Sequence, residues 1–557
     1  MITPNTPLMS LALAASQWPS AAIFKTPIVD DHMNPIAPHI IGYDTVTYSE
    51  FHNYVETSAR YWYAKLSEDD LPTGSIVGYC SRGGSYIDFV HIHGLSKAGY
   101  IPQIFTLLPQ STEVILALLE KSGARALLYQ EEYFDLGKTL SKMRPGLKVY
   151  PIYSTTRDLP TTQLSQALPD LPRSQPTDIT YILHSSGTTS GMPKLVPYTS
   201  RLVETLLHKA TISTLGARPT PGKSSPDVNS WAGSACHISG FAHLINIMHQ
   251  GSCIVQPTFL PPPIGEFKSM FRLAGLNRAR LNSPLLSRVL KASRTDSELL
   301  DLLRALKSIR HGGASLPTDD SEWAELNKLN LVNAYGSTEC GSPLMTSQGN
   351  EIGSPKQGYL RPVQPLKEDG TPLTRYRFDP VTEGKDSDGG VVLRELVVLR
   401  ESADLPHHSL LGGQEDYHTG DLFQEVKPGK YIHRGRVDDW IMMANAGKCD
   451  ASSIENDAKT LCRDLFSECL AVGSGQSSPV LIVEADTNQE KRLMQDIYNR
   501  IANSDSHQKR YTHERIASPA AIIIVPPGSM IRTATKGSIR RKAVEEALAD
   551  RIGAIFS

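Results

Sequence analysis

Short apolar segments alternate with helical ones from about residue 74 onward, and this alternation restricts the fold more than any other feature of the chain. Residues 75–81 (SIVGYCS) and 124–130 (ARALLYQ) have the pattern of buried strands. Residues 85–100 and 112–123 have apolar residues at helical spacing and contain a glycine near their ends. Strands that are joined through helices run parallel, so the sequence predicts an α/β fold in which helices cover both faces of a largely parallel sheet.

The pattern changes toward the end of the chain. Strand patterns recur at 252–257 and 330–336, in keeping with the alternation. The last part holds only a few strand patterns with helices between them, which is typical of a small α+β domain. We therefore predict two domains, residues 1–437 and 438–557, with the boundary at Asp438.

Composition and charge exclude several classes of partner. The 557 residues carry a net charge of −2, and 20% of them are charged, so we expect neither a nucleic acid nor an anionic membrane surface as a partner. No apolar run approaches the roughly 18 residues that a membrane-spanning helix needs. The seven cysteines are scattered and form no CxxC pair, which argues against a zinc site or a disulfide framework and favours a reducing compartment.

Residues 8–21 (LMSLALAASQWPSA) are similar to the apolar core of a signal peptide. The residues before them contain no Lys or Arg, which a secretory signal carries at its start. We therefore predict that this segment forms a first amphipathic helix and that the protein is cytoplasmic.

A run of small hydroxyl residues and glycines lies within residues 182–196 (ILHSSGTTSGMPKLV). Such a run is typical of a flexible linker. It follows a buried strand pattern at 179–183, however, and a strand that enters a glycine-rich turn can direct several backbone N–H groups at a phosphate. The spacing differs from the Walker pattern, because two residues separate Gly191 from Lys194. Composition alone does not decide between linker and phosphate loop.

Four further stretches combine a turn with hydroxyl, carboxylate or basic side chains. They are NAYGSTE (333–339), YHTGDL (417–422), GRVDDWI (435–441) and TATKGSIRRKAV (533–544). Each alone is typical of an ordinary turn or a surface charge. In this order, after the glycine-rich loop, the five motifs resemble the adenylate-forming superfamily, which includes acyl-CoA synthetases, luciferases and adenylation domains of nonribosomal peptide synthetases. The resemblance extends from about residue 45 to 545 and identifies the loop as a phosphate cradle.

The resemblance implies a fold and a reaction. The expected fold is a large N-terminal adenylate-forming domain of parallel and mixed sheets layered with helices, followed by a small mobile α+β domain that turns about a hinge at Asp438. The expected reaction is the ATP-dependent activation of a carboxylic acid to an acyl-adenylate, with release of pyrophosphate and with Mg²⁺ as the metal. The acyl group then passes to a thiol.

The resemblance also implies a nucleotide site. Thr188 and the backbone of its loop would hold the triphosphate, and Thr338 would donate to the α-phosphate. Glu339, a hard carboxylate, would bind Mg²⁺, and Asp421 would accept from the ribose hydroxyls. Tyr335 would stack on the adenine. The expected ATP- and AMP-binding residues are Ser185, Ser186, Gly187, Thr188, Thr189, Lys194, Gly313, Ala314, Asn333, Tyr335, Thr338, Asp421 and Arg436.

The order Lys536-Gly537 near the end of the chain resembles one subgroup of this superfamily. It is similar to the adenylation domains of fungal peptide-synthetase-like enzymes, which include the adenylation–carrier–reductase proteins that reduce carboxylic acids. Lys536 would approach the reacting carboxylate and the α-phosphate, where its charge would stabilise the transition state. The expected catalytic residues are Lys536, Thr188, Glu339 and His237.

Residues 235–243 (ACHISGFAH) resemble the start of the acyl pocket. Domains that activate amino acids carry an Asp directly after the position of His237, and here Ile238 stands there. A buried ammonium without a counter-charge is costly, so an α-amino acid is a poor candidate. A His at position 237 is common in relatives that take aryl acids, although it could also be a hydrogen-bonded core histidine. The expected pocket is a flat, mostly apolar slot, suited to an aromatic acid, and it is formed by His237, Ile238, Gly240, Phe241, Ala242, Ser283, Gly312, Ala334 and Gly336.

The acyl acceptor is expected to lie outside these 557 residues. We find neither a carrier-domain serine motif nor a nicotinamide-binding fingerprint in the chain. The resemblance therefore implies phosphopantetheine on a carrier (thiolation) domain as the acceptor, with a reductase or thioesterase domain downstream. One alternative is a free-standing acyl- or aryl-CoA ligase. Another is a catalytically silent module that binds nucleotide or acyl ligands, but the joint presence of Thr188, Glu339, Asp421 and Lys536 argues against it.

Overall fold

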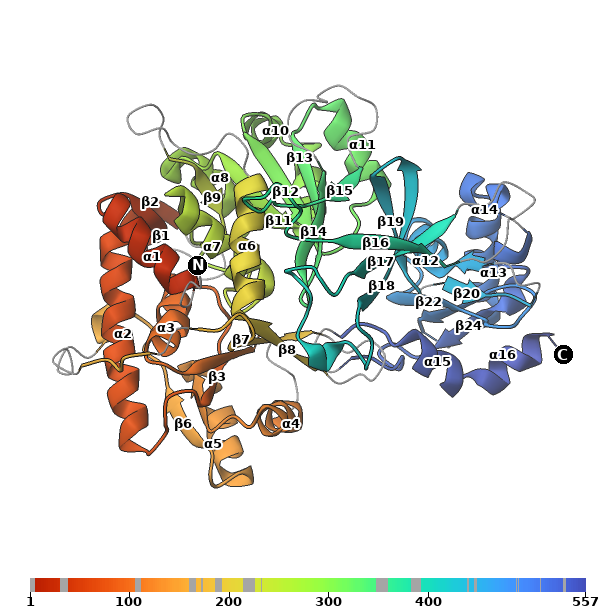
Figure 1. Ribbon diagram of the computed structural model, residues 1–557. Coiled ribbons are helices and arrows are strands. Elements are labelled where there is room, and N and C mark those ends of the chain that lie inside the picture. Colours follow the sequence, from red (N-terminus) through yellow and green to blue (C-terminus); the bar gives the residue numbers. More distant parts are fainter. Residues whose placement is uncertain are drawn as a thin grey trace.

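The chain folds into layered sheets and helices (Figure 1). The computed structural model describes residues 6–30, 39–105, 112–159, 167–171, 174–185, 193–213, 226–231, 233–346, 359–381, 392–437, 440–444, 448–486, 488, 490–510, 512–533 and 537–556. The strands of the described residues form sheets of thirteen, six, three and two strands.

The six-stranded sheet contains the first of the strand–helix repeats. Its order is β6-β5-β3-β4-β7-β8, and all neighbours are parallel except β7 and β8. The strands are β3 (Ile76–Cys80), β4 (Ile101–Phe105), β5 (Ala126–Tyr129), β6 (Lys148–Pro151), β7 (Ile179–Ser185) and β8 (Lys194–Thr199). The connecting helices are α3 (Tyr86–Lys97), α4 (Thr112–Ser122) and α5 (Phe134–Met143). Helix α3 begins where it does because Ser85 and Asp88 form a capping box that satisfies its first N–H groups.

The thirteen-stranded sheet is parallel at its centre and antiparallel toward both edges. Its order is β16-β17-β18-β19-β15-β14-β13-β12-β11-β9-β10-β1-β2, and the neighbours from β13 to β1 are parallel. Its strands are β1 (Ala22–Asp30), β2 (His39–Thr47), β9 (Val228–Ser230), β10 (Cys253–Val255), β11 (Arg278–Asn282), β12 (Ser308–Gly312), β13 (Leu331–Ser337), β14 (Gly341–Thr346), β15 (Leu360–Pro362), β16 (Tyr376–Pro380), β17 (Leu393–Val398), β18 (Tyr417–Lys427) and β19 (Lys430–Arg436). The carboxyl ends of β11, β12 and β13 therefore meet at one edge, which is where open α/β sheets bind ligands.

Further helices pack against the two large sheets in two separate core clusters. They are α1 (Thr6–Gln17), α2 (Tyr48–Glu68), α6 (Ser200–Ser213), α7 (Ile238–Gln250), α8 (Ile264–Ala274), α9 (Ser283–Ser293), α10 (Ser297–Arg304) and α11 (Thr318–Leu326). Phe24 of β1, Trp62 of α2 and Tyr181 of β7 belong to one cluster of buried side chains. The predicted first helix is confirmed as α1, which buries Leu11 and Ala14 in this cluster.

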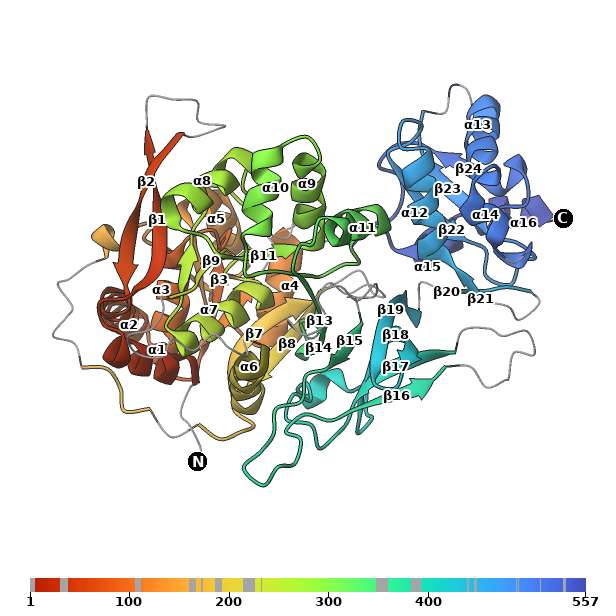
Figure 2. The ribbon, with the colours of Figure 1, turned by 90° about the horizontal axis from the view of Figure 1, so that it is seen from above.

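The elements after β19 form a smaller unit with a core of its own. Its strands are β20 (Trp440–Met442), β21 (Lys448–Asp450), β22 (Glu468–Val472), β23 (Val480–Glu484) and β24 (Ile522–Val525), and its helices are α12 (Ala451–Leu461), α13 (Glu490–Ala502), α14 (Asp505–Lys509), α15 (Arg541–Ala547) and α16 (Ala549–Phe556). Figure 2 shows this unit at the end of the molecule opposite to α1 and α2, as does Figure 1. The proposed hinge, Asp438, lies outside the described residues, so the boundary between the two domains stays a prediction.

The predicted architecture, large mixed sheets layered with helices and a small α+β unit, is confirmed. The alternation of strand and helix patterns carried this prediction, because burial on both faces of parallel strands leaves a readable apolar run. Among the described residues, no helix is long and apolar enough to cross a membrane.

Candidate active site

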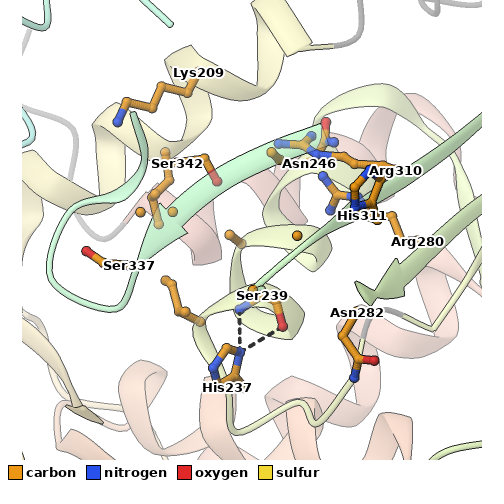
Figure 3. Close-up of a pocket in the computed structure, with 18 of the residues that line it drawn as sticks. Lys209, His237, Ser239, Asn246, Arg280, Asn282, Arg310, His311, Ser337 and Ser342 are labelled. Atoms are coloured by element: carbon orange, nitrogen blue, oxygen red, sulfur yellow. Dashed lines mark hydrogen bonds between the residues drawn. The ribbon is translucent and has the colours of Figure 1, made fainter. Parts of the chain in front are cut away.

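A cavity of about 220 Å³ lies between α6, α7 and the strands β11 to β14 (Figure 3). Its floor is the edge where parallel strands end, and its wall is helix α7. The residues that line it are Leu206, Lys209, Ala210, His237, Ile238, Ser239, Ala242, Asn246, Arg280, Leu281, Asn282, Arg310, His311, Gly312, Gly313, Ala334, Gly336, Ser337, Gly341, Ser342 and Val363.

Most of the predicted pocket residues meet in this cavity. They are His237, Ile238, Ala242, Gly312, Ala334 and Gly336, together with Gly313 from the predicted nucleotide set. His237 caps α7, because its Nδ1 accepts from the backbone N–H of Ser239 at 3.1 Å. The ring is half-buried at the N-terminus of α7.

The close packing of two glycines shapes the wall. A Cβ on Gly312 would lie 2.2 Å from the carbonyl oxygen of Ala334, and one on Gly336 would lie 2.4 Å from that of Gly341. Real Cβ atoms do not approach backbone oxygen so closely, and any side chain here would push the strands apart. The two glycines therefore let the ends of β12, β13 and β14 approach one another beside the cavity.

Three predicted pocket residues lie behind the wall and do not line the cavity. Phe241 points into the core, where its ring lies 4.7 Å from that of Tyr181. Gly240 lets α7 approach the backbone, since a Cβ there would be 2.3 Å from the carbonyl oxygen of Ser234. Ser283 is buried and donates to the carbonyl oxygen of Ala314 at 2.6 Å. Gly240 and Phe241 lie behind the wall because α7 turns one face to the core and the other to the cavity, whereas Ser283 begins α9.

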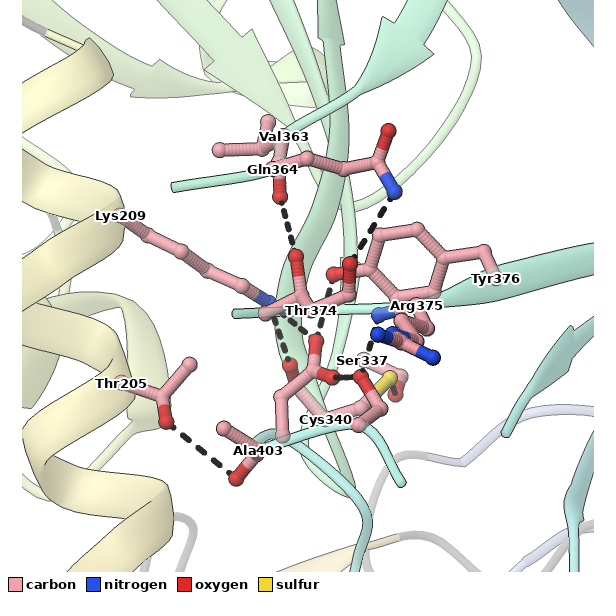
Figure 4. Close-up of polar contacts among 12 residues, drawn as sticks. Thr205, Lys209, Ser337, Cys340, Val363, Gln364, Thr374, Arg375, Tyr376 and Ala403 are labelled. Carbon is pink, nitrogen blue, oxygen red and sulfur yellow. Dashed lines mark hydrogen bonds and ion pairs between the residues drawn. The ribbon is translucent and has the colours of Figure 1, made fainter. Parts of the chain in front are cut away.

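The sequence prediction missed the basic residues of the cavity. Lys209, Arg280 and Arg310 line it, and none of them was expected there. Lys209 is buried and forms a 2.5 Å ion pair with the buried Asp404. Asp404 also accepts from the hydroxyl of Tyr376 at 2.5 Å, so this charge is held in a satisfied network (Figure 4). The pair joins residues 195 positions apart, and no local pattern could have predicted it.

Arg280 and Arg310 are direct neighbours in the parallel register of β11 and β12. Both are half-buried. Burial lowers the pKa of Arg310 to about 10, and burial together with the charge of Arg310 lowers the pKa of Arg280. Nη1 of Arg280 lies 2.6 Å from Nδ1 of His243, whose own pKa is lowered by burial and by both arginines. His243 is therefore neutral and brings no charge of either sign.

The predicted ribose and adenine residues lie together beside the strand ends. The hydroxyl of Tyr335 donates to Oδ2 of Asp421 at 2.7 Å. Arg436 faces Asp421 in the register of β18 and β19, and its Nη1 lies 3.3 Å from the same oxygen. Burial and the neighbouring carboxylate of Asp421 raise the pKa of Tyr335 well above its ordinary value, so this hydroxyl stays protonated and a donor.

Thr338 and Glu339 occupy the turn between β13 and β14. Thr338 is buried, and its carbonyl oxygen accepts from the hydroxyl of Tyr198 at 2.6 Å, which anchors the turn to β8. Glu339 is half-buried. Its charge contributes, after burial, to the raised pKa of Tyr417. The described residues contain no group of three or more metal-binding side chains. A single carboxylate nevertheless suits Mg²⁺, which takes one or two protein carboxylates and its other ligands from phosphates and water.

The other predicted site residues stand as follows. Ser185 ends β7 and Lys194 begins β8, and the two are partners in the register of that hairpin. Asn333 lies in β13, where its backbone N–H donates to Thr346. Ala314 directly follows the cavity residue Gly313. The predicted site residues that lie outside the described residues are Ser186, Gly187, Thr188, Thr189, Lys536 and Asp438.

Comparison with known proteins gives consistent matches over the chain. Residues 29–367 match the AMP-binding enzyme family, and residues 438–557 match the AMP-binding enzyme C-terminal domain. The chain is 29% identical over 526 residues to the AMP-binding domain-containing enzyme iboA of Amanita muscaria (strain Koide BX008), which covers 92% of this chain and 96% of that protein.

Two multidomain proteins are also similar. The chain is 25% identical over 481 residues to the adenylate-forming reductase stbB of Stachybotrys bisbyi, covering 84% of this chain and 41% of the reductase. It thus spans less than half of that protein. The solved A-PCP didomain of the carboxylic acid reductase from Segniliparus rugosus, in complex with AMP, superposes with a TM-score of 0.71 at 13% identity, over 100% of this chain and 82% of that one. At 13% identity, this similarity shows that the two chains share a fold and nothing beyond that.

The family match over residues 29–367 extends across more than half of the 557 residues. All residues that line the cavity lie within this match, as does Tyr335. This chain therefore belongs to the AMP-binding enzymes and is an ATP-dependent adenylating ligase.

Proposed function

We propose that this ligase activates a carboxylic acid other than an α-amino acid, and specifically an aryl acid, and then passes the acyl group to the phosphopantetheine thiol of a carrier domain. One observation carries the first part. Among the described residues that line the cavity there is no Asp or Glu, and Ile238 occupies the position from which a carboxylate would pair with an α-ammonium. An ammonium there would lose its hydration without a counter-charge.

The walls of the cavity support a planar acid. Ile238 and Ala242 of α7 line the cavity together with Leu281 and Val363. Apolar side chains of this kind can bury the faces of a ring, which is how small-molecule sites gain most of their affinity.

In the proposed first step, a carboxylate oxygen of the acid attacks the α-phosphorus of ATP. The bond from that phosphorus to the bridging oxygen of pyrophosphate breaks, and acyl-adenylate and pyrophosphate result. Thr338 would donate to the α-phosphate, and Lys536 would offset the negative charge that develops between phosphate and carboxylate. Glu339 would hold Mg²⁺, which neutralises phosphate charge when it is bound.

The nucleotide would be oriented by the Tyr335–Asp421 cluster. Oδ2 of Asp421 accepts from Tyr335 and Arg436, Nε2 of His433 lies 3.4 Å from its Oδ1, and a carboxylate has about four acceptor positions. It therefore keeps capacity for the ribose hydroxyls. Because Tyr335 and Arg436 hold the carboxylate in place, the acceptor is oriented before the nucleotide arrives.

The activation step is tested by ATP–pyrophosphate exchange with a panel of acids. We expect exchange with benzoate-type acids and only background with L-amino acids. Robust exchange with a proteinogenic amino acid, together with no exchange for aryl acids, would contradict the proposal. Lys536→Ala should lower exchange by about two to three orders of magnitude, since a charge contact near 4 Å in such a site is worth about 4 kcal/mol. The matched control is Lys542→Ala, because Lys542 is exposed on α15.

The transfer step rests on the Lys536-Gly537 order and on the similarity to an adenylate-forming reductase. The test offers a phosphopantetheinylated carrier domain and free CoA at equal concentrations, with saturating ATP and acid. We expect a covalent acyl-thioester on the carrier, detected by intact mass, and much less acyl-CoA. If CoA is acylated as fast as the carrier, the CoA-ligase alternative replaces the carrier proposal.

Asp438 is the proposed hinge between the two steps. Asp438→Pro fixes φ near −65° and should hinder the rotation of the small domain. We expect it to spare pyrophosphate exchange and to block acyl transfer. Equal loss of both half-reactions would remove the hinge assignment.

A further inference from the structure

Lys209, Arg280 and Arg310 line the cavity, but only Lys209 has a carboxylate as an ion-pair partner among the described residues. Lys209 is neutralised by Asp404 at 2.5 Å. Arg280 and Arg310 form no ion pair with any described carboxylate. Asp227, which lies near the start of the same strands, is engaged by Arg278 and Lys307 instead. The cavity therefore contains two guanidinium groups whose charge the described part of the protein does not balance.

The two unbalanced arginines lie on one side of the cavity. Arg280 and Arg310 are cross-strand neighbours of β11 and β12, and Figure 3 shows them grouped with Asn246 and away from His237. We call Arg280, Arg310 and Asn246 the inner end of the cavity. Helix α7 connects the two ends, since His237 caps its first turn and Asn246 lies in its third.

Neighbouring groups do not relieve the charge of the inner end. His243 accepts from Nη1 of Arg280 but is neutral, because burial and both arginines lower its pKa. Asn246 directs its Oδ1 to the side-chain amide of Gln250 at 2.6 Å. Like charges placed opposite each other on neighbouring strands repel, and half-buried charges lack full hydration. An anion that entered between the two guanidinium groups would relieve both costs.

The distance from the inner end to the strand ends determines the length of the small molecule that bears this anionic group. Arg280 precedes the end of β11 by two residues, and Arg310 precedes the end of β12 by two residues. At about 3.3 Å per residue, this places their backbone roughly 6–7 Å behind the strand ends, where the adenylation chemistry is proposed. A cavity of about 220 Å³ holds a small molecule with groups at that separation.

We propose that the acid activated by this ligase is a dicarboxylic acid, whose second carboxylate is bound by Arg280 and Arg310 at the inner end of the cavity. The planar guanidinium fork matches a carboxylate, and two such forks on adjacent strands can each donate two hydrogen bonds to it. This inference rests on the proposed function for the fate of the first carboxylate, which becomes the adenylate. It adds a determinant of substrate choice that the apolar walls do not supply.

The test compares acids that differ only in the charge of the second group. Terephthalate is paired with 4-carbamoylbenzoate, and adipate with its monoamide, in ATP–pyrophosphate exchange. We expect kcat/KM to be about 100-fold higher for the dicarboxylate than for its monoamide. This is the size of effect seen when one partner of a desolvated charge pair is removed. Arg310→Met should remove this preference, Arg310→Lys should restore part of it, and KM for ATP should stay unchanged in both. Arg492→Met, at an exposed arginine of α13, is the control and should behave as the parent protein.

Binding of the free acids separates this inference from the proposed function. Calorimetry without ATP should show binding of at least one dicarboxylate that Arg310→Met abolishes. If a dicarboxylate binds in this way but no acid supports exchange, the inner-end proposal stands and the proposed function falls. If monoamides and dicarboxylates exchange equally well, and Arg310→Met changes neither, the inner-end proposal falls and the proposed function stands. Arg310→Met should fold, because it removes an unbalanced charge, and urea unfolding checks this.

Discussion

The hydroxyl of Tyr335 donates a 2.7 Å hydrogen bond to Asp421, and this contact joins the end of β13 to the middle of β18. The two residues belong to different motifs and are 86 positions apart. The contact holds the carboxylate beside the strand ends that border the cavity. The proposed nucleotide site therefore includes a residue from the antiparallel part of the large sheet, whereas most strand residues of the cavity come from β11, β12 and β13.

Asp421→Asn should weaken ATP binding. The change removes the charge that accepts from Tyr335 and Arg436 and turns one acceptor oxygen into a donor. Hydrogen bonds to charged groups are worth about 1.5–3 kcal/mol, so KM for ATP should rise roughly 10- to 100-fold. Steady-state kinetics with saturating acid measures this. Asp301→Asn, at an exposed aspartate, is the control, and an unchanged KM for ATP in Asp421→Asn would contradict the assignment.

Asp404→Asn should destabilise the fold by about 3–5 kcal/mol, because it leaves Lys209 buried beside the cavity without its counter-charge. Urea unfolding measures the loss. The double variant Lys209→Met/Asp404→Asn should recover much of it, since the buried charge is then gone. A double variant less stable than Asp404→Asn would show that the ion pair is not the source of the effect.

Gly240→Ala should lower kcat/KM for the acid more than kcat/KM for ATP. Its Cβ would lie 2.3 Å from the carbonyl oxygen of Ser234, so the start of α7, which holds His237 and Ile238, must move. We expect kcat/KM for the acid to fall at least about tenfold, since small misplacements in a site cost this much or more. Gly265→Ala in α8 is the matched control. Nothing lies within 4 Å of a Cβ there, and the change should be neutral or stabilise by up to about 1 kcal/mol.

The unfolding free energy should fall as the pH is lowered from 7 to 5. Burial lowers the pKa of His91 and of His93 to about 4, whereas both titrate near 6.5 when unfolded. The unfolded chain therefore binds more protons between these values, and stability that is present above pH 6.5 is lost toward pH 4. The loss between pH 7 and pH 5 should be about 2 kcal/mol for each histidine.

His93→Phe should reduce that loss, because the phenyl ring cannot take up a proton in the unfolded chain. Urea unfolding at both pH values gives the difference. His408 is exposed, and His408→Gln should leave the pH dependence unchanged. If His93→Phe loses as much stability as the parent between pH 7 and pH 5, burial of a neutral imidazole is not the cause.

Sequence alone predicted the α/β layers, because apolar periodicity is a local property. A strand buried on both faces, such as β3, reads as an apolar run, and helix α3 is marked by the cap at Ser85. The motif residues Tyr335 and Asp421 could likewise be named from the chain, because their motifs resemble those of the adenylate-forming superfamily, although the structure places them in the strands β13 and β18.

Which side chains meet in the cavity was decided by the tertiary structure. The alternation of side chains along β11 and β12 predicts that Arg280 and Arg310 share a face of the sheet with every second residue of their strands. It does not predict that this face borders a cavity. Only the parallel register that sets the two strands side by side shows this. The burial of Phe241 in the core could not be read from the sequence for the same reason, because the side of α7 that meets the core depends on where the sheets lie. Local patterns determine the elements of this protein, and contacts between distant segments determine its cavity, because charge and burial at a site depend on neighbours that lie far away along the chain.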